Sequence, residues 1–353
     1  MTIAATQASA YASTASPARI AERIRAAGSV LVTAHDKPDG DAVGSVLAVT
    51  RALRTLGKRV QPWLCGPFDP SLGVLLAGEK PGRAPEAMPA DDFDLVIVVD
   101  TGSWSQLEIL GPWMKARLER CINVDHHRSG DTGFADRIVD ISCASCTQAL
   151  VPVLDALGVP FDAPGSGGVG SIAEALFAGL ATDTGWFRFS GADAAVFALA
   201  SRLLSAGVDK DRLYRQLEET ARPQRIDLLA RAMGSIQWLA NGRAALMRLR
   251  AEDFAQSSGS SEDLAGAVNA PMTVGSVEVS ALLSQNGTDP VVKISLRSKP
   301  PMTKGGAFVD VNQLAAQFGG GGHVHAAGAK FKGSMEQANQ ALAQAIERAL
   351  ASR

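Results

Sequence analysis

Imidazole and carboxylate side chains follow one another directly in this chain, at the end of a short apolar run. Asp125, His126 and His127 come after the run at 121–124. The chain has five histidines, and two of them are adjacent at this point. Ionisable groups placed where a buried strand opens into a loop are costly unless a cation neutralises them. The triplet therefore favours a metal site.

Three other segments carry the same ligand types after an apolar or small-residue run. They are HDKPDGDAVGS at 35–45, the Asp that follows LVIVV at 95–99, and GLATDTGWF at 179–187. A single Asp after a strand is more often a turn or helix cap, and a single His is more often structural. Recurrence in four segments favours a shared metal site, with these expected ligands: His35, Asp39, Asp41, Asp100, His126 and Asp183.

Asp100 is the best candidate to bridge two ions, because it ends a fully apolar strand where an unpaired carboxylate is unfavourable. Mixed oxygen and nitrogen ligands suit Mn²⁺ best, with Mg²⁺, Co²⁺ or Fe²⁺ as alternatives. Two such ions close together would activate water and clamp a phosphate group. The expected cofactor is therefore a pair of divalent ions.

Alternating strands and helices in the front half must position these ligands. The pattern predicts strands at 29–34, 59–64 and 95–99 and a fourth ending at Asp125, with helices at 17–27, 41–56, 112–119, 142–157, 169–181 and 191–205. This rhythm predicts an α/β fold, a parallel sheet with helices on both faces. Ligands bind beyond the carboxyl ends of strands in such sheets, so the polar residues are expected in one crevice.

The regular alternation of predicted strands and helices ends before residue 240, and strands lie closer together in the sequence after it. The length of 353 residues suits two domains. We expect a disordered tail at 1–16, a catalytic domain at 17–205, a helical connector at 206–240 and a smaller α+β domain at 241–353. The last domain has expected strands at 243–250, 277–284 and 291–297 and expected helices at 309–318 and 335–351. The connector would permit closure of one domain on the other.

A glycine-rich motif in the second domain, GGGGHVHAAG at 319–328, is a candidate anion site. Consecutive glycines leave backbone N–H groups uncovered, which favours an anion nest, although a flexible surface loop is the alternative. Arg297 ends a predicted strand, and its guanidinium suits bidentate phosphate recognition; an ordinary exposed arginine is the alternative. The expected substrate contacts in this domain are Gly320, Gly321, Gly322, His323, Arg297 and Ser298.

Composition excludes several other functions. The net charge of −2 argues against a broad basic surface for long duplex nucleic acid, and no apolar stretch reaches the ~20 residues that span a bilayer. Cys143 and Cys146 form a CxxC without a second ligand pair, so buried structural thiols are favoured over zinc or redox roles. GSGGVG at 165–170 follows no strand and is interpreted as a linker. A reduced, cytoplasmic protein is expected.

The order HxxxDxD, a strand-ending Asp, Asp-His-His and a later Asp resembles the DHH phosphoesterases. GGGHxxAAG resembles the motif of the DHH-associated C-terminal domain, so the resemblance covers most of the chain. It implies Mn²⁺, with His35, Asp39 and Asp100 at one ion and Asp41, Asp100, His126 and Asp183 at the other. It also implies that His127 faces the substrate phosphate, that Asp125 orients the site behind it, and that Arg297 reads the nucleotide.

The two-domain plan most resembles the nanoRNase/pAp phosphatase branch of that family. The resemblance implies a two-metal phosphoesterase that cleaves short oligoribonucleotides or 3′-phosphoadenosine 5′-phosphate (pAp), with Asp100, Asp125 and His127 in catalytic roles. The alternatives are a cyclic or linear dinucleotide phosphodiesterase, an exopolyphosphatase or pyrophosphatase, and a non-catalytic nucleotide sensor or RNA-binding module. A homodimer through the first domain is also an expectation from the resemblance.

Overall fold

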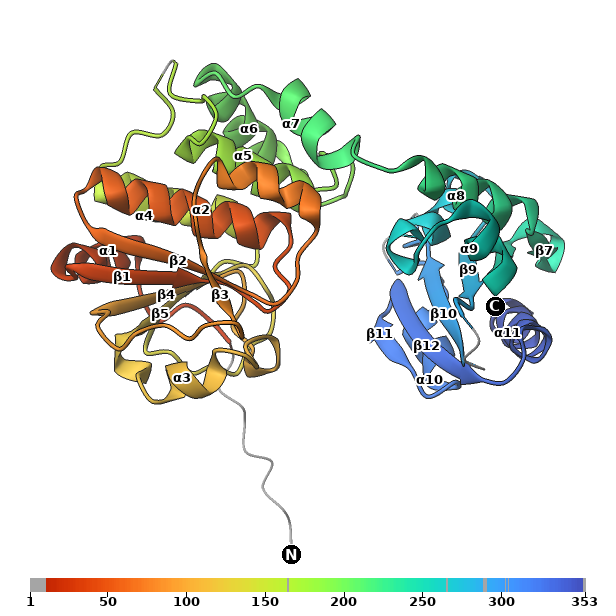
Figure 1. Cartoon of the computed structure of the whole chain (residues 1–353). Coiled ribbons are helices and arrows are strands. Elements are labelled where there is room, and N and C mark those ends of the chain that lie inside the picture. Colours follow the sequence, from red (N-terminus) through yellow and green to blue (C-terminus); the bar gives the residue numbers. More distant parts are fainter. Residues whose placement is uncertain are drawn as a thin grey trace, which may run out of the picture. The chain divides into compact units, whose positions relative to one another are not determined.

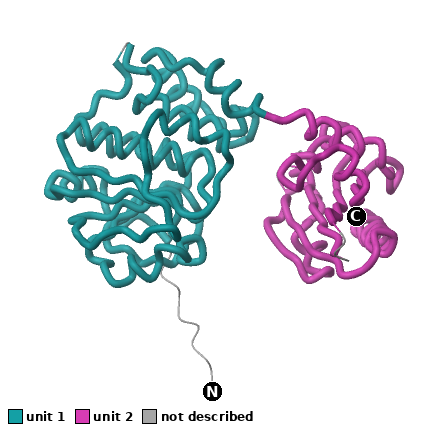
Figure 2. The backbone as a smooth tube through the Cα atoms, in the orientation of Figure 1, with its two compact units in different colours: residues 1–220 teal, residues 221–353 magenta. Residues whose placement is uncertain are grey.

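The chain folds as two compact units, Met1–Thr220 and Ala221–Arg353 (Figure 2). The structure is a computed structural model that describes residues 11–351 except 164, 265, 288–290, 302 and 304. Within that part of the chain, no helix is long and apolar enough to cross a membrane. Each unit has its own sheet and its own hydrophobic core, and each is described separately below.

Six parallel strands form the sheet of the first unit, in the order β3-β2-β1-β4-β5-β6. Their bounds are β1 Ser29–Thr33, β2 Arg59–Cys65, β3 Gly82–Ala84, β4 Leu95–Val99, β5 Cys121–Asp125 and β6 Asp136–Val139. The central strands β1, β4 and β5 are buried at every position, as expected for a parallel sheet covered on both faces. The short edge strands β3 and β6 carry too few apolar residues to be recognised from the sequence.

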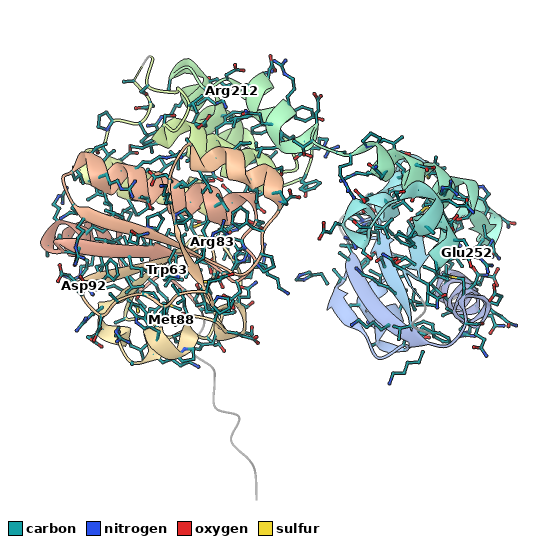
Figure 3. The ribbon with its side chains drawn as sticks, in the orientation of Figure 1. Trp63, Arg83, Met88, Asp92, Arg212 and Glu252 are labelled. Atoms are coloured by element: carbon teal, nitrogen blue, oxygen red, sulfur yellow. The ribbon has the colours of Figure 1, made fainter. Side chains whose placement is uncertain are left out.

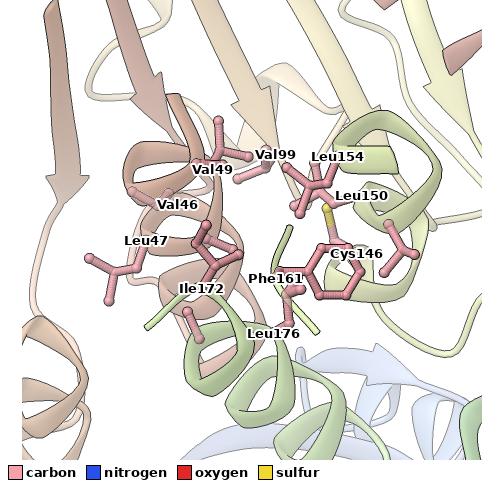
Figure 4. Packing of buried hydrophobic residues seen from close by; sticks show 14 of the residues in the cluster. Val46, Leu47, Val49, Val99, Cys146, Leu150, Leu154, Phe161, Ile172 and Leu176 are labelled. Carbon is pink, nitrogen blue, oxygen red and sulfur yellow. The ribbon is translucent and has the colours of Figure 1, made fainter. Parts of the chain in front are cut away.

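Helices cover both faces of this sheet, which confirms the predicted fold class (Figure 1). The helices of the unit are α1 Pro17–Ala26, α2 Gly40–Thr55, α3 Gly111–Lys115, α4 Cys146–Leu157, α5 Ile172–Asp183, α6 Ala194–Ser205 and α7 Lys210–Glu218. The larger core lies between the sheet and α1, α2, α4 and α5, and Figure 4 shows Val49 of α2 and Leu150 and Leu154 of α4 around Val99. A smaller core lies under α3 on the opposite face.

Close packing of α2 against α5 depends on two glycines. A Cβ added at Gly44 of α2 would lie 2.6 Å from the backbone oxygen of Ala175, and one at Gly179 of α5 would lie 2.7 Å from a carboxylate oxygen of Asp41. Neither distance is compatible with a side chain. The two helices therefore approach closely enough to place the start of α2 beside the end of α5, where Asp183 lies.

The second unit is built on a mixed sheet in the order β11-β12-β10-β9-β8-β7, in which only β8 and β9 pair in parallel. Its strands are β7 Gln237–Leu239, β8 Ala244–Leu249, β9 Val279–Ser284, β10 Val291–Ser298, β11 Gly321–His323 and β12 Ala326–Lys332. The helices α10 Val311–Ala316 and α11 Met335–Ala351 pack on one face, and α8 Pro223–Gly234 and α9 Ala251–Ser257 pack on the other. This agrees with the expected α+β class.

The segment expected to be a connector at 206–240 is divided between the two units. Leu213 and Leu217 of α7 belong to the core of the first unit, and Leu228 of α8 belongs to a core of the second. Arg212 of α7, which is labelled in Figure 3, also forms an ion pair with the buried Glu174 of α5. Few residues therefore separate the two units, and the division lies between Thr220 and Ala221.

The expectation of a disordered tail over 1–16 is wrong for the part that the structure describes; residues 1–10 lie outside the described residues. The segment from Tyr11 to Ala15 runs along the open edge of β6. The backbone amides of Thr14 and Ala15 donate to the oxygen of Arg137, at 2.9 and 3.1 Å, and the amide of Val139 donates to Ser13 Oγ at 2.9 Å. Backbone pairing to a sheet edge orders even a segment with little apolar content.

Candidate metal centre

All six expected metal ligands meet at the carboxyl ends of β1, β4 and β5. Three groups of side chains each place their ligand atoms within 4.8 Å of one another: His35 with Asp39 and Asp100, Asp41 with His126 and Asp183, and Asp100 with His126 and His127. Asp100 belongs to two of these groups, and the other ligands are divided between its two sides. The arrangement is the one expected for two neighbouring ions that share a carboxylate.

The first group is held by the start of α2. Asp39 caps this helix, and its Oδ1 accepts from the amides of Asp41 and Ala42 at 3.1 Å. His35 Nε2 lies 3.8 Å from Asp39 Oδ1 and 3.6 Å from Asp100 Oδ2. Its Nδ1 lies 3.0 Å from the backbone oxygen of Asp36, which fixes the ring with Nε2 toward the carboxylates.

The second group lies deeper in the unit. Asp41 is 2 % exposed, and its two oxygens accept from the amides of Cys146 and Thr147 at the start of α4, at 2.5 and 3.0 Å. His126 Nε2 is 3.8 Å from Asp41 Oδ2 and 3.7 Å from Asp183 Oδ2. The same carboxylate therefore caps a helix and faces the ligand space.

Asp100 joins the two groups, and both its backbone and one of its carboxylate oxygens lie in unfavourable surroundings. It is 2 % exposed, its φ is +61°, and its Oδ1 forms no hydrogen bond although His126 Nε2 lies 3.3 Å away. A left-handed backbone and an unsatisfied buried carboxylate oxygen each cost free energy, and such strain is typical of functional sites. Divalent cations would satisfy that oxygen, so the residues present fit a metal centre.

The pKa values of the clustered side chains reflect the same excess of carboxylates. Burial raises the pKa of Asp41 well above its usual range, and Asp100 and Asp183 raise it further. Burial also raises the pKa of Asp183, and despite the opposing effect of His126 that pKa is about 6. Burial lowers the pKa of His126, but the facing carboxylates outweigh it and raise that pKa to about 9. Without metal, protons therefore take the place of the cations.

Asp125 and His127 pair with each other, although His127 also belongs to the third of these groups. Asp125 is fully buried, and its Oδ1 lies 2.8 Å from His127 Nδ1. This hydrogen bond raises the pKa of His127 and commits Nδ1, which leaves Nε2 available to a substrate. Although His127 lies near Asp100, at 3.9 Å, its contact with Asp125 favours an orienting pair over a third metal ligand.

Cys146 belongs to the packing beside this centre. It is the first residue of α4, it is buried in the larger core, and its thiol donates to the oxygen of Val124 at 3.2 Å (Figure 4). Burial raises the pKa of this thiol well above its usual range, and that of Cys143 to about 12. Both thiols are therefore protonated at neutral pH, which fits structural roles.

In the second unit, Arg297 and His323 share one face of the sheet. Arg297 of β10 pairs with Ala326 of β12, which pairs in turn with His323 of β11, and laterally paired residues point to the same side. Burial lowers the pKa of Arg297, and no described carboxylate forms an ion pair with it. A half-buried guanidinium across a small residue from an exposed imidazole suits an anion.

The glycine run does not form the expected anion nest. The amides of Gly319 and Gly320 donate to Ala316 and Ala315, and that of Gly322 donates to Asn312 Oδ1 at 2.9 Å. Gly321 and Gly322 instead belong to β11, which pairs closely with β12. Glycine is required there for packing, since a Cβ at Gly320 would lie 2.1 Å from the oxygen of Gly328. The sequence could not distinguish a nest from a glycine strand.

Ser298 also has a different position from the one expected. It is buried, and its Oγ lies 3.0 Å from His325 Nδ1. The ring of His325 contacts Phe308 at 4.8 Å between centroids. Ser298 therefore holds His325 and does not reach an external ligand directly, whereas Arg297 is half-buried and His323 is exposed on the face that they share.

Family models and relatives agree with this arrangement. The DHH family, N-terminal domain, matches residues 29–179, and the DHHA1 domain matches residues 245–352. The bifunctional oligoribonuclease and PAP phosphatase NrnA of Thermus thermophilus is 30% identical over 94% of this chain and 93% of its own. The protein of the same name from Bacillus subtilis is 26% identical over 89% of this chain and 93% of its own.

Solved structures show the same two-domain fold. An exopolyphosphatase-related protein from Bacteroides fragilis superposes with a TM-score of 0.82 at 26% identity, over 94% of this chain and 95% of that one. RecJ from Thermus thermophilus in complex with Mn²⁺ has a TM-score of 0.51 at 17% identity, over 96% of this chain and 54% of that one, which is a likeness of fold. With its metal-ligand groups, its two matched domains and a relative similar along nearly the whole length, the chain belongs to the DHH phosphoesterase family, in the form that carries a DHHA1 domain.

Proposed function

We propose that this protein hydrolyses short oligoribonucleotides to mononucleotides and pAp to AMP, with two divalent ions. The observation that carries the proposal is the convergence of four carboxylates and two imidazoles on the carboxyl ends of the first unit's strands. The substrate class is supported by the relatives named oligoribonuclease and PAP phosphatase, which match 94% and 89% of this chain. Mn²⁺ is the ion we favour, given its suitability for mixed ligands.

The chain's own residues divide into three roles in this proposal. His35, Asp39, Asp41, Asp100, His126 and Asp183 would hold the ions. When bound, two divalent ions lower the pKa of water and neutralise phosphate oxygens. His127, held by Asp125 through Nδ1, would offer Nε2 to a phosphate oxygen, which stabilises negative charge as the P–O ester bond is exchanged for a bond to water.

The second unit is proposed to bind the nucleotide. Arg297 would donate two hydrogen bonds to a phosphate, and His323, exposed on the same face, would add a third. Ser298 would act indirectly through His325. Gly320, Gly321 and Gly322 would leave the backbone at the edge of the sheet uncovered, so that a ligand could approach it closely. We further propose a cytoplasmic homodimer.

A second activity is favoured by one observation, the exopolyphosphatase-related name of the Bacteroides fragilis structure. Polyphosphate and nucleotides offer the same phosphate chemistry to the ligand groups, so only the rest of the substrate distinguishes them. A non-catalytic sensor is less well supported, because all six expected ligands are present and adjacent.

A substrate panel tests the proposal. The wild-type protein with Mn²⁺ is incubated with 5′-pApA, longer RNA, pAp, cyclic and linear dinucleotides, pyrophosphate and polyphosphate. Mononucleotide from 5′-pApA and phosphate from pAp are expected, and an Asp100→Asn variant should lose more than about a hundredfold in rate. Asp92→Asn is the matched control, because this carboxylate is exposed and, among the residues that the structure describes, pairs only with Arg59, at the end of the strands opposite the candidate ligands. No turnover of 5′-pApA or pAp would refute the proposal, and turnover of polyphosphate alone would favour the second activity.

A further inference from the structure

Tyr11 reaches the buried side of the Asp-His-His triplet from the N-terminal segment. Its hydroxyl lies 2.7 Å from Asp125 Oδ2 and 2.8 Å from Asn123 Oδ1. Asn123 uses its amide nitrogen for the backbone oxygens of Val98 and Thr101, which turns its oxygen toward the phenol. The sequence carries only two tyrosines, and this one lies in a stretch of Ala, Ser and Thr.

Two glycines form the slot that the phenol occupies. A Cβ at Gly102 would lie 1.8 Å from the tyrosine oxygen, and one at Gly130 would lie 2.6 Å from the ring. Gly102 follows β4 and Gly130 follows the triplet itself, so the ring sits between the two loops that carry Asp100 and His127. The chain therefore has space for this side chain at this position because both loops lack side chains there.

The hydrogen bonds of Asp125 show that its orientation depends on the hydroxyl of Tyr11. Oδ1 accepts from the amides of His126 and His127, at 2.8 and 3.2 Å, and from the imidazole of His127. Among the described residues, Oδ2 has one donor, the hydroxyl of Tyr11. Asp125 is fully buried, so water does not replace a missing donor without rearrangement. Without the hydroxyl, Oδ2 of Asp125 would lack a hydrogen-bond donor. Rotation of the carboxylate toward another donor would then be favoured, and this rotation would break the contact with His127.

We propose that Tyr11 is a positioning residue for His127. Its hydroxyl fixes the carboxylate of Asp125, and the fixed carboxylate holds the imidazole of His127 with Nε2 toward the substrate phosphate. The part played by His127 rests on the function proposed above. The hydrogen-bonded chain from Tyr11 through Asp125 to His127 is independent of which phosphate ester is cleaved.

The N-terminal segment delivers the phenol through contacts that do not involve the triplet. Ser13 Oγ donates to the oxygen of Val139 at 3.0 Å and accepts from its amide, and Arg137 Nε donates to the oxygen of Ala12 at 2.8 Å. These contacts lie on β6, on the outer side of the sheet edge. The chain thus offers a matched pair of variants, one that removes the hydroxyl and one that loosens the segment alone.

The first experiment compares Tyr11→Phe with Ser13→Ala. Tyr11→Phe should lower kcat about tenfold with KM nearly unchanged, the magnitude typical of a residue that orients a group at a metal site. Ser13→Ala should leave kcat within about twofold of wild type. A role limited to holding the segment would instead make the serine variant at least as impaired as the phenylalanine one, and that result would overturn the proposal.

A second readout does not depend on turnover. Protein labelled with ¹⁵N-histidine is examined by NMR without metal and with diamagnetic Mg²⁺. The ring nitrogens of His127 should change in shift and tautomer population in Tyr11→Phe and remain as in wild type in Ser13→Ala. Unchanged His127 signals in Tyr11→Phe would overturn the proposal. This measurement also separates it from the proposed function, since a protein inactive on every substrate would still show or lack the change.

The glycine slot supplies a double-mutant test. Gly102→Ala places a methyl group where the phenol lies, so it should lower kcat as Tyr11→Phe does. In a Tyr11→Ala background the space is empty, and adding Gly102→Ala should then have little further effect. An equal loss in both backgrounds would mean that Gly102 acts through its neighbour Asp100, and it would overturn the assignment of the slot to Tyr11.

Discussion

Removing the charge of Asp183 should stabilise the metal-free protein and weaken the metal-bound one. Asp183 ends α5 and faces Asp41 and His126 across the ligand space. Its pKa is about 6, against an ordinary value of 3.8, chiefly because burial disfavours the charged form. Asp183→Asn keeps the shape of the side chain and removes that charge. The cost of ionising a buried carboxyl group then disappears together with a proposed metal ligand.

The magnitude follows from that pKa. A rise from 3.8 to about 6 corresponds to about 3 kcal/mol at 1.36 kcal/mol per pH unit. The side chain is 34 % exposed, so solvent screening reduces this to about 1–2 kcal/mol. In a unit of this size, 1 kcal/mol shifts Tm by about 2–4 °C, and the metal-free variant should therefore melt about 2–8 °C above wild type at pH 8.

The pH dependence has a definite sign. A carboxyl group with a raised folded-state pKa binds its proton more tightly in the folded state than in the unfolded one. Its destabilising effect is therefore absent below about pH 4, grows as pH rises toward 6 and is complete above it. The difference between variant and wild type should vanish at low pH and reach its full size at pH 8.

The assay is thermal unfolding with chelator and with excess Mn²⁺. Saturation at about a hundred times Kd adds about 2.7 kcal/mol per ion, so Mn²⁺ should raise the wild-type Tm by at least about 5 °C, and by less in the variant. Wild type should thus be the less stable protein with chelator and the more stable one with metal. A variant that is no more stable than wild type in chelator at pH 8, or that gains the full Mn²⁺ shift, would refute this reasoning.

Three further predictions concern the ligands, the second unit and the helix packing. Because the carboxylates raise the pKa of His35 to about 11 and that of His126 to about 9 despite burial, Mn²⁺ binding at pH 7 should release protons, seen by calorimetry in buffers of different ionisation enthalpy. Arg297→Gln should raise KM for pAp about tenfold or more, because a charge-assisted contact to phosphate contributes about 1.5–3 kcal/mol. Gly44→Ala should cost more than about 2 kcal/mol in the free energy of unfolding, because its Cβ meets the backbone of α5.

The last two of these predictions have a control within the chain. Arg348→Gln removes an exposed arginine from the last turn of α11 and should leave KM unchanged. Gly73→Ala adds a methyl group with no atom within 4 Å and should leave unfolding unchanged. Metal binding whose heat is the same in every buffer, a KM for Arg297→Gln equal to that of its control, or a harmless Gly44→Ala would contradict the corresponding argument.

The central strands and the clustering of the candidate ligands were predictable from the sequence because their signals are local. A run such as LVIVV is long enough to fill a strand and apolar enough to require burial on both faces, so β4 was predicted with its observed bounds. Asp100 and His126 were recognised because ionisable residues directly after such runs are costly without a partner. The element boundaries elsewhere differ by a few residues, where caps such as Ser145 and Ser171 begin helices later than expected.

Other features depend on partners far away in the chain. The glycines at 319–322 have the composition of a nest and of a strand alike, and pairing with β12 decided between them. Residues 206–240 carry helical periodicity throughout, and only the cores that α7 and α8 contact divide them between the units. The edge strands β3 and β6 are too short and too polar to be recognised without their neighbours.

The candidate ligand types, their places after buried strands and the family that they resemble could all be identified from the amino-acid sequence. Metal ligation needs particular side chains, and the energetic cost of burying those side chains is visible from their immediate neighbours in the chain. Their orientation, by contrast, depends on contacts between distant segments. Tyr11 contacts Asp125 across more than a hundred residues, through a slot made by Gly102 and Gly130, and no local pattern encodes such a contact.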